Sequence, residues 1–296
     1  MDTINIVLNS IKVMLKKPTM FIYMAVMISM FSVIDYFYRF SVLILLLIKS
    51  FKLGDIVPML QLFIQPIIFT KVLLAIVVFL VVISMILALF FSGLFNKLIN
   101  SLYNKKNVRE NFFKSIKKYY LKTTWTFIRT GLILIISILA LLIASVPAII
   151  VSIAAYNSGD IYIPLAAIID VISAFILFLV FYFIKMYLIF WFPSMLNYKK
   201  SFKIARMVVN KNFWSIIYNF IATDVILFFG ITITIIALAE RDKFIISVPM
   251  IILGSAILVV AIVFFFSYVF TAFKFYVDKL RDEYKPEESE EEGIDQ

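Results

Sequence analysis

Cysteine and histidine are both absent from the 296-residue sequence. Their absence excludes disulfide bonds, thiolate nucleophiles, imidazole bases and haem ligation by either residue, and it restricts any zinc site to carboxylate ligands. The sequence therefore lacks the residues on which the common hydrolase and oxidoreductase mechanisms depend. We expect a protein without enzymatic activity, cofactor or bound metal.

Turn residues and charged residues are scarce as well. Seven glycines and eight prolines leave too few turns for a chain of many short strands. Charged residues make up 16% of the chain and apolar residues 64%, and the mean hydropathy is +1.05. Soluble globular proteins are about 25% charged and about 45–50% apolar. The composition therefore predicts an all-α, polytopic membrane protein.

Six apolar stretches are each long enough to cross a bilayer, which takes about 20 residues of helix. They cover residues 19–48, 66–95, 125–155, 161–192, 212–238 and 244–273. The first stretch is too long for the apolar part of a signal peptide and has no small-residue cleavage site, so we expect it to be retained. The sequence thus predicts six transmembrane helices.

Basic residues predict the orientation of these helices, because short loops rich in Lys and Arg stay in the cytoplasm. More than half of the 28 Lys and Arg residues lie before the first stretch, between the second and third, and between the fourth and fifth. The opposite loops hold only Lys49, Lys52, Arg241 and Lys243. We therefore expect a cell-membrane protein with both termini in the cytoplasm.

Each of the three basic segments also has apolar residues at helical spacing. The three apolar stripes are Ile4, Leu8, Ile11 and Leu15; Phe112, Ile116, Tyr119 and Tyr120; and Tyr198, Phe202, Ala205 and Val209. A basic helix with one apolar stripe is expected to lie in the headgroup layer of the membrane. These segments are therefore predicted to be amphipathic interfacial helices.

Anionic lipid headgroups are the expected partners of these segments, because each basic residue near a membrane surface attracts them. The predicted contacts are Lys12, Lys16, Lys17, Lys114, Lys117, Lys118, Lys203 and Arg206. No recognised nucleic-acid-binding motif accompanies the positive charge, so we expect no nucleic-acid partner.

The basic segments also suggest a threefold internal repeat. They share a short motif, which reads Asn-Ser-Ile-Lys at Ser10, Lys-Ser-Ile-Lys at Ser115 and Lys-Ser-Phe-Lys at Ser201. The repeat would divide the chain into units of residues 1–107, 108–196 and 197–273, each an interfacial helix followed by two spans. A charged tail, 274–296, would follow, with a disordered acidic end. Chance similarity among basic juxtamembrane segments is the alternative.

The six spans and the aromatic-flanked segments around Ser115 and Ser201 resemble those of a group of bacterial and archaeal membrane proteins. The group includes the integral-membrane domain attached to some glycerophosphodiester phosphodiesterases. The resemblance extends over most of the chain. It implies architecture rather than activity, because the phosphodiesterase chemistry of that family belongs to a separate soluble domain without a counterpart in this sequence.

Four ionisable residues in the predicted spans are candidate functional groups, because charge is costly inside a membrane. Asp35 and Arg39 are helical neighbours that would neutralise each other near the outer surface, where the first span could end and residues 51–66 could form a cap or re-entrant segment. Asp170 and Asp224 are expected ~14 Å and ~18 Å deep, near the midplane. They would form a proton or cation site or an anchor for a cationic substrate, or would hold helices together as protonated hydrogen-bonding groups.

Two functions remain open. The first is a non-enzymatic integral membrane protein that acts with lipids or partners, such as an accessory or permease-like subunit in envelope homeostasis or export. The second is a small proton- or cation-coupled transporter or channel that uses Asp170 and Asp224. The sequence has no Gly-rich ATP-binding motif that ends in Lys and Ser or Thr, so energy from nucleotide would come from another chain, such as an ATPase subunit.

Overall fold

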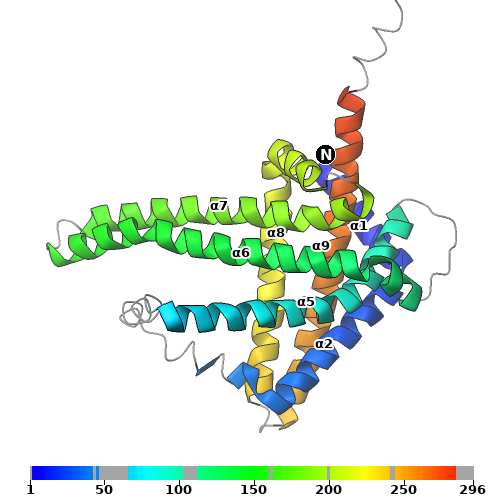
Figure 1. Ribbon diagram of the computed structural model, residues 1–296, viewed down its shortest axis with the longest axis horizontal. Coiled ribbons are helices and arrows are strands. Elements are labelled where there is room, and N and C mark those ends of the chain that lie inside the picture. The colour runs from blue at the N-terminus through cyan, green and yellow to red at the C-terminus, as the bar shows by residue number, and fades with distance from the viewer. Residues whose placement is uncertain are drawn as a thin grey trace, which may run out of the picture. The chain divides into compact units, whose positions relative to one another are not determined.

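The computed structural model describes residues 2–42, 45–46, 66–102, 112–159, 163–198, 201–240 and 244–284. Every regular element within these ranges is helical (Figure 1). The helices are α1 (Asp2–Lys16), α2 (Thr19–Tyr38), α5 (Pro66–Leu102), α6 (Phe112–Asn157), α7 (Ile163–Asn197), α8 (Ser201–Ala239) and α9 (Phe244–Tyr284).

Six of these helices are long and apolar enough to cross a membrane, which confirms the predicted all-α, six-span class. The candidate spans are Thr19–Tyr38, Leu73–Leu102, Phe113–Ala155, Ile163–Leu196, Ser201–Ala239 and Ser247–Leu280. Several are longer than the predicted stretches. A helix of 41 residues such as α9 is ~62 Å long, about twice the thickness of the hydrocarbon layer.

The first span is shorter than its apolar stretch. Helix α2 ends at Tyr38, because Arg39 adopts a left-handed conformation with φ 54° and ψ 36°. Its N–H donates a hydrogen bond of 2.7 Å to the Asp35 carbonyl and so caps the helix. Helix α5 begins at Pro66. The cap or re-entrant segment predicted before Pro66 lies outside the described residues.

The three basic segments join their spans in three different ways. The first is a separate helix, α1, which ends at Lys16. Helices commonly end before a proline such as Pro18, because proline has no backbone N–H to continue the helix and restricts the residue before it. The second runs into its span without interruption as the start of α6. The third is set off within α8 by a kink at Asn212, where φ is −126° and ψ is 16°.

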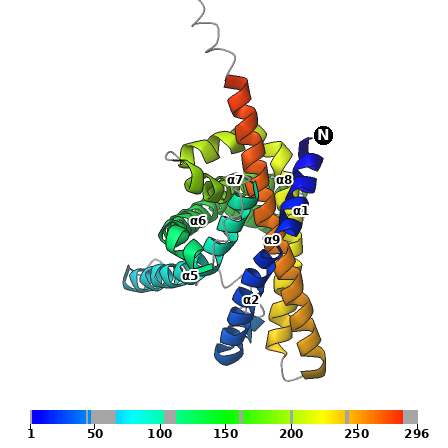
Figure 2. The same ribbon diagram turned by 90° about the vertical axis from the view of Figure 1, so that its right-hand side faces the viewer.

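The described helices form two compact units. The first comprises residues 1–124 and 214–296, and the second comprises residues 125–213. In the first unit, α9 packs against α1 and α2, and α2 also packs against α5 (Figure 2). The predicted division into three repeat units and a tail remains a prediction, although α9 continues to Tyr284, well into the predicted tail.

Aromatic side chains fill the core of the first unit. Phe95 of α5 lies with its ring centroid 5.2 Å from that of Phe270 on α9, and both side chains are fully buried. Phe220 of α8 makes an edge contact with Phe265 of α9, with centroids 5.2 Å apart. Asn219 of α8 donates a hydrogen bond of 3.1 Å to the hydroxyl of Tyr268 on α9.

The second unit consists of most of α6, the whole of α7 and the first turns of α8. Phe127 and Phe192 lie 4.8 Å apart between α6 and α7, and beside them Thr126 donates a hydrogen bond of 2.5 Å to the Met195 sulfur. The start of α8 is held by α7, because the indole N–H of Trp191 donates to the Ser201 hydroxyl at 2.9 Å.

Candidate functional site

Helix α1 has two different apolar faces. Ile6 and Val13 are buried on the side that packs against α9. Ile4, Leu8 and Leu15 are 66%, 58% and 68% exposed and follow one another along another face of the helix. This exposed row contains three of the four residues of the predicted stripe. The apolar stripe of α1 is therefore largely exposed, with Ile11 as its half-buried member.

Lysine side chains lie beside this row. Lys12 and Lys16 are exposed, and Lys17 is half-buried. At 100° per residue, Lys12 falls between the row and the polar face that carries Asn5 and Asn9, and Lys16 falls on that polar face. A helix with this cross-section has an apolar edge suited to acyl chains and a basic flank suited to phosphate.

The stripes of the other two basic segments are placed differently. Tyr119 of the second is only 8% exposed, and Ala205 and Val209 of the third are fully buried. These side chains are buried instead of facing outward, so among the described stripe residues those of α1 alone are mostly exposed. The basic residues of these segments are nevertheless exposed: Lys114, Lys117, Lys118, Lys203 and Arg206.

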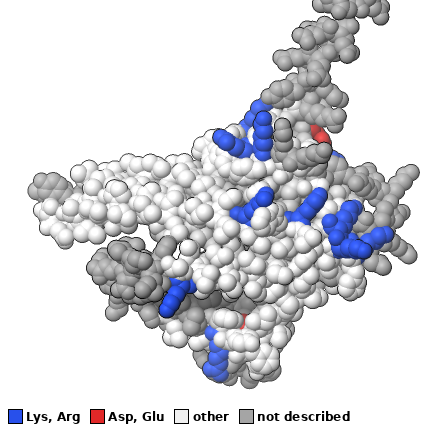
Figure 3. All heavy atoms as spheres, viewed as in Figure 1, with Lys and Arg blue, Asp and Glu red and all other residues white. Residues whose placement is uncertain are grey.

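Asp170 is held by the neighbouring helix. The hydroxyl of Ser152 on α6, which is buried, donates a hydrogen bond to a carboxylate oxygen of Asp170 on α7. The face of the α6–α7 hairpin seen in Figure 3 is otherwise uncharged over most of its length. Sequence reasoning missed Ser152, because the pairing of positions across two antiparallel helices depends on the turn between them.

Asp224 lies on α8 in the first unit and is half-buried. Asp170 belongs to the second unit. Within the described ranges, no three acidic side chains gather closely enough to hold a metal ion.

Asp35 is engaged by Ser41 through both carboxylate oxygens. The Ser41 backbone N–H and its hydroxyl donate hydrogen bonds of 2.6 Å each, one to either oxygen. Arg39, the partner predicted from the spacing, is exposed and lies beyond the helix end. No local sequence signal predicts the contact with Ser41, because it requires the left-handed conformation of Arg39, which residues other than glycine rarely adopt.

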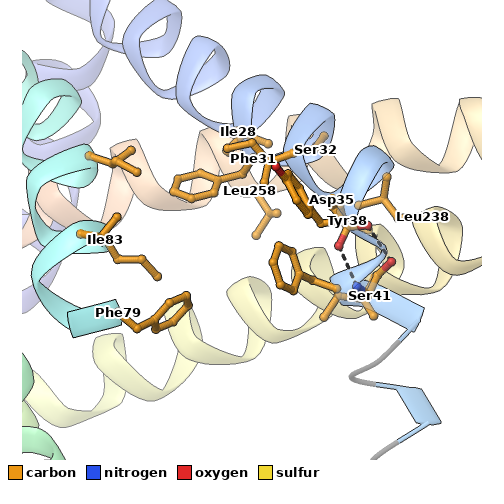
Figure 4. A pocket seen from close by; sticks show the side chains of 16 residues that line it. Ile28, Phe31, Ser32, Asp35, Tyr38, Ser41, Phe79, Ile83, Leu238 and Leu258 are labelled. Atoms are coloured by element: carbon orange, nitrogen blue, oxygen red, sulfur yellow. Dashed lines mark hydrogen bonds between the residues drawn. The ribbon is translucent and has the colours of Figure 1, made fainter. Parts of the chain in front are cut away.

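A cavity of about 580 Å³ opens among α2, α5, α8 and α9 within the first unit (Figure 4). Its volume falls within the range of about 300–1,000 Å³ that is typical of ligand sites. The lining is almost wholly apolar and includes Phe31, Phe79, Ile83, Leu238 and Leu258. It lies at the end of α2 that is remote from α1.

The few polar groups of the cavity are concentrated at one end. Asp35, Tyr38 and Ser41 lie together in Figure 4, whereas Phe79 and Ile83 lie at the opposite side. Asp35 is the single charged side chain among the described residues that line the cavity. The cavity is therefore amphipathic, with an apolar body and a carboxylate at one end.

The geometry thus offers an exposed amphipathic helix, an inter-helix carboxylate contact in the second unit and an amphipathic cavity in the first. Comparison with protein families, with curated proteins and with solved structures finds no match for this chain.

Proposed function

We propose that this protein is a non-enzymatic integral membrane protein that binds anionic lipids through its basic cytoplasmic segments. It acts there with protein partners, as an accessory or permease-like subunit in envelope homeostasis or export. In this arrangement both termini lie in the cytoplasm, as the distribution of Lys and Arg predicts.

The exposed row of Ile4, Leu8 and Leu15 on α1 carries this proposal. Three large apolar side chains on one helix face would be unfavourable in water, and burying each fully contributes about 1.5–3 kcal/mol. The acyl chains next to the headgroups supply an apolar environment for them, while Lys12 and Lys16 remain at the level of the phosphates.

Charge makes the lipid contact selective. A basic residue near an anionic surface contributes about 1 kcal/mol, so the lysines of α1 together favour anionic over zwitterionic headgroups. Because α1 packs against α9 and joins α2 through Lys17 and Pro18, a change in lipid composition at α1 acts directly on the helices of the first unit.

A fluorescent probe on α1 tests the proposal. The chain has no cysteine, so Leu8→Cys and Asn9→Cys each give one labelling position, on the apolar row and on the polar face. In nanodiscs, an environment-sensitive probe at Leu8 should emit at shorter wavelength than one at Asn9. Phosphatidylglycerol should increase this difference, and Lys12→Gln with Lys16→Gln should remove the increase. Equal emission from the two positions in every lipid would contradict the proposal.

A protein partner is tested separately. The full chain, extracted from its source membrane in native nanodiscs, should bring a stoichiometric partner with it, such as an ATPase subunit. Recovery of the chain with lipid alone would contradict the accessory-subunit part of the proposal and leave the lipid contact intact.

A further inference from the structure

We propose that the cavity among α2, α5, α8 and α9 binds an amphiphile with an apolar chain and a cationic amine head, which Asp35 receives. This inference concerns the end of the first unit remote from α1 and does not depend on the lipid contact of the basic segments.

The body of the cavity selects for a hydrocarbon chain. Phe31, Phe79 and Ile83 present aromatic and aliphatic surface to it, and polar side chains are few. An apolar chain that leaves water for such a lining contributes about 0.8 kcal/mol for each buried CH₂. A polar or highly hydrated ligand would gain little there and would lose its hydration.

The polar end selects the head. Asp35 brings one carboxylate, and no Lys or Arg is among the described lining residues. Ser41 provides one hydrogen bond to each carboxylate oxygen and thereby holds the group in place at the cavity end, and each oxygen can still accept a further donor. An amine supplies both the donors and the positive charge that complement this carboxylate. An anionic head, such as a fatty-acid carboxylate, would be repelled.

Under the predicted orientation, the cavity lies toward the outer leaflet, since α2 runs outward from the cytoplasmic α1. A ligand with a long apolar chain reaches such a site from the bilayer. The occupant is therefore a lipophilic amine taken from the membrane rather than a water-soluble cation.

Photo-crosslinking with dodecylamine that carries a diazirine near the end of its chain tests this inference. The full-length protein in phosphatidylcholine nanodiscs should be labelled on peptides of α2 and α5. Unlabelled dodecylamine should compete at a concentration about tenfold or more below that of dodecanol or dodecanoate, because a hydrogen bond to a charged group contributes about 1.5–3 kcal/mol. Equal competition by the three heads, or labelling confined to other helices, would overturn the proposal.

Variants separate the head from the chain. Asp35→Asn should abolish the preference for dodecylamine over dodecanol, and Ile83→Trp should fill the cavity and abolish labelling. Ser41→Ala keeps the carboxylate and should retain the preference. Val33→Trp is the matched control, because Val33 is exposed on α2 and does not line the cavity. Labelling that survives Ile83→Trp in a protein that melts as the wild type does would also overturn the proposal. An absence of labelling in the wild type would overturn it as well.

Discussion

Asp170 shows how a carboxylate within an apolar hairpin is accommodated. The Ser152 hydroxyl donates a hydrogen bond to it across the α6–α7 contact, which is the arrangement expected of a polar group that joins two membrane helices. This contact favours the packing role that the sequence left open for Asp170 over a transport site.

The packing role predicts a stability effect at Ser152. Ser152→Ala should lower the free energy of unfolding by about 1 kcal/mol, because Asp170 loses its partner on the neighbouring helix. Asp170→Asn should cost less, since the amide oxygen still accepts the hydroxyl proton. Thermal unfolding in detergent measures both changes.

Ser145→Ala is the matched control for Ser152→Ala, because the Ser145 hydroxyl donates to the Leu142 carbonyl within α6 itself. An equal loss of stability in the Ser145 and Ser152 variants would contradict the packing role. A stable Asp170→Asn variant that loses a cation-dependent flux would instead support the transporter alternative.

Helices α8 and α9 approach closely at two glycines. A Cβ atom on Gly254 of α9 would lie 2.4 Å from Thr234 Oγ1 and 3.1 Å from the Thr234 backbone nitrogen on α8. The Thr234 hydroxyl is itself fixed by a hydrogen bond of 2.8 Å to the Gly230 carbonyl. At Gly230, an added Cβ would meet side-chain atoms, Leu258 Cδ2 at 3.0 Å and Leu258 Cγ and Ile257 Cγ2 at 3.1 Å. Small residues that let two backbones approach are typical of helix pairs in membranes.

This close approach predicts unequal effects of two similar substitutions. Gly254→Ala should destabilise the protein by about 1–3 kcal/mol, because neither the fixed hydroxyl nor the backbone nitrogen of Thr234 can move aside easily. Gly230→Ala should cost less, since its nearest contacts are side-chain atoms at 3.0–3.1 Å, which need to move by only a few tenths of an ångström. Thr234→Ala should partly rescue Gly254→Ala. Thermal unfolding of the four variants is the measurement, and equal effects at the two glycines would show that the close contact is not limiting.

Sequence and structure agree best at the level of whole helices. Hydropathy over about 20 residues is a local property, so the six spans were predictable one by one. The end of α5, the start of α6, the start of α8 and the end of α9 were not predictable, because polar helical residues continue past the apolar stretches and hydropathy does not record them. The threefold repeat, the tail and the family resemblance remain predictions.

The candidate sites were predictable only in part. The exposed stripe of α1 follows from helical spacing, and three of its four residues are exposed as expected. The packed stripes at Tyr119 and Val209 show the limit of that reasoning, since spacing alone does not tell whether an apolar face meets lipid or protein. The contact of Asp35 with Ser41 and the cavity beside it depend on a left-handed residue and on four helices coming together, neither of which is a local property of the sequence.

Native mass spectrometry of the full chain released from nanodiscs with equal amounts of phosphatidylglycerol and phosphatidylcholine tests the central claim most directly. Lipids retained by the wild type should be enriched in phosphatidylglycerol. Lys12→Gln, Lys16→Gln and Lys17→Gln together should reduce this enrichment about tenfold or more, because each lysine contributes about 1 kcal/mol. The control variant combines Arg39→Gln with Lys71→Gln, two exposed basic positions outside the three basic segments, and it should leave the enrichment unchanged. An equal lipid composition in the wild type and the triple variant would contradict the account.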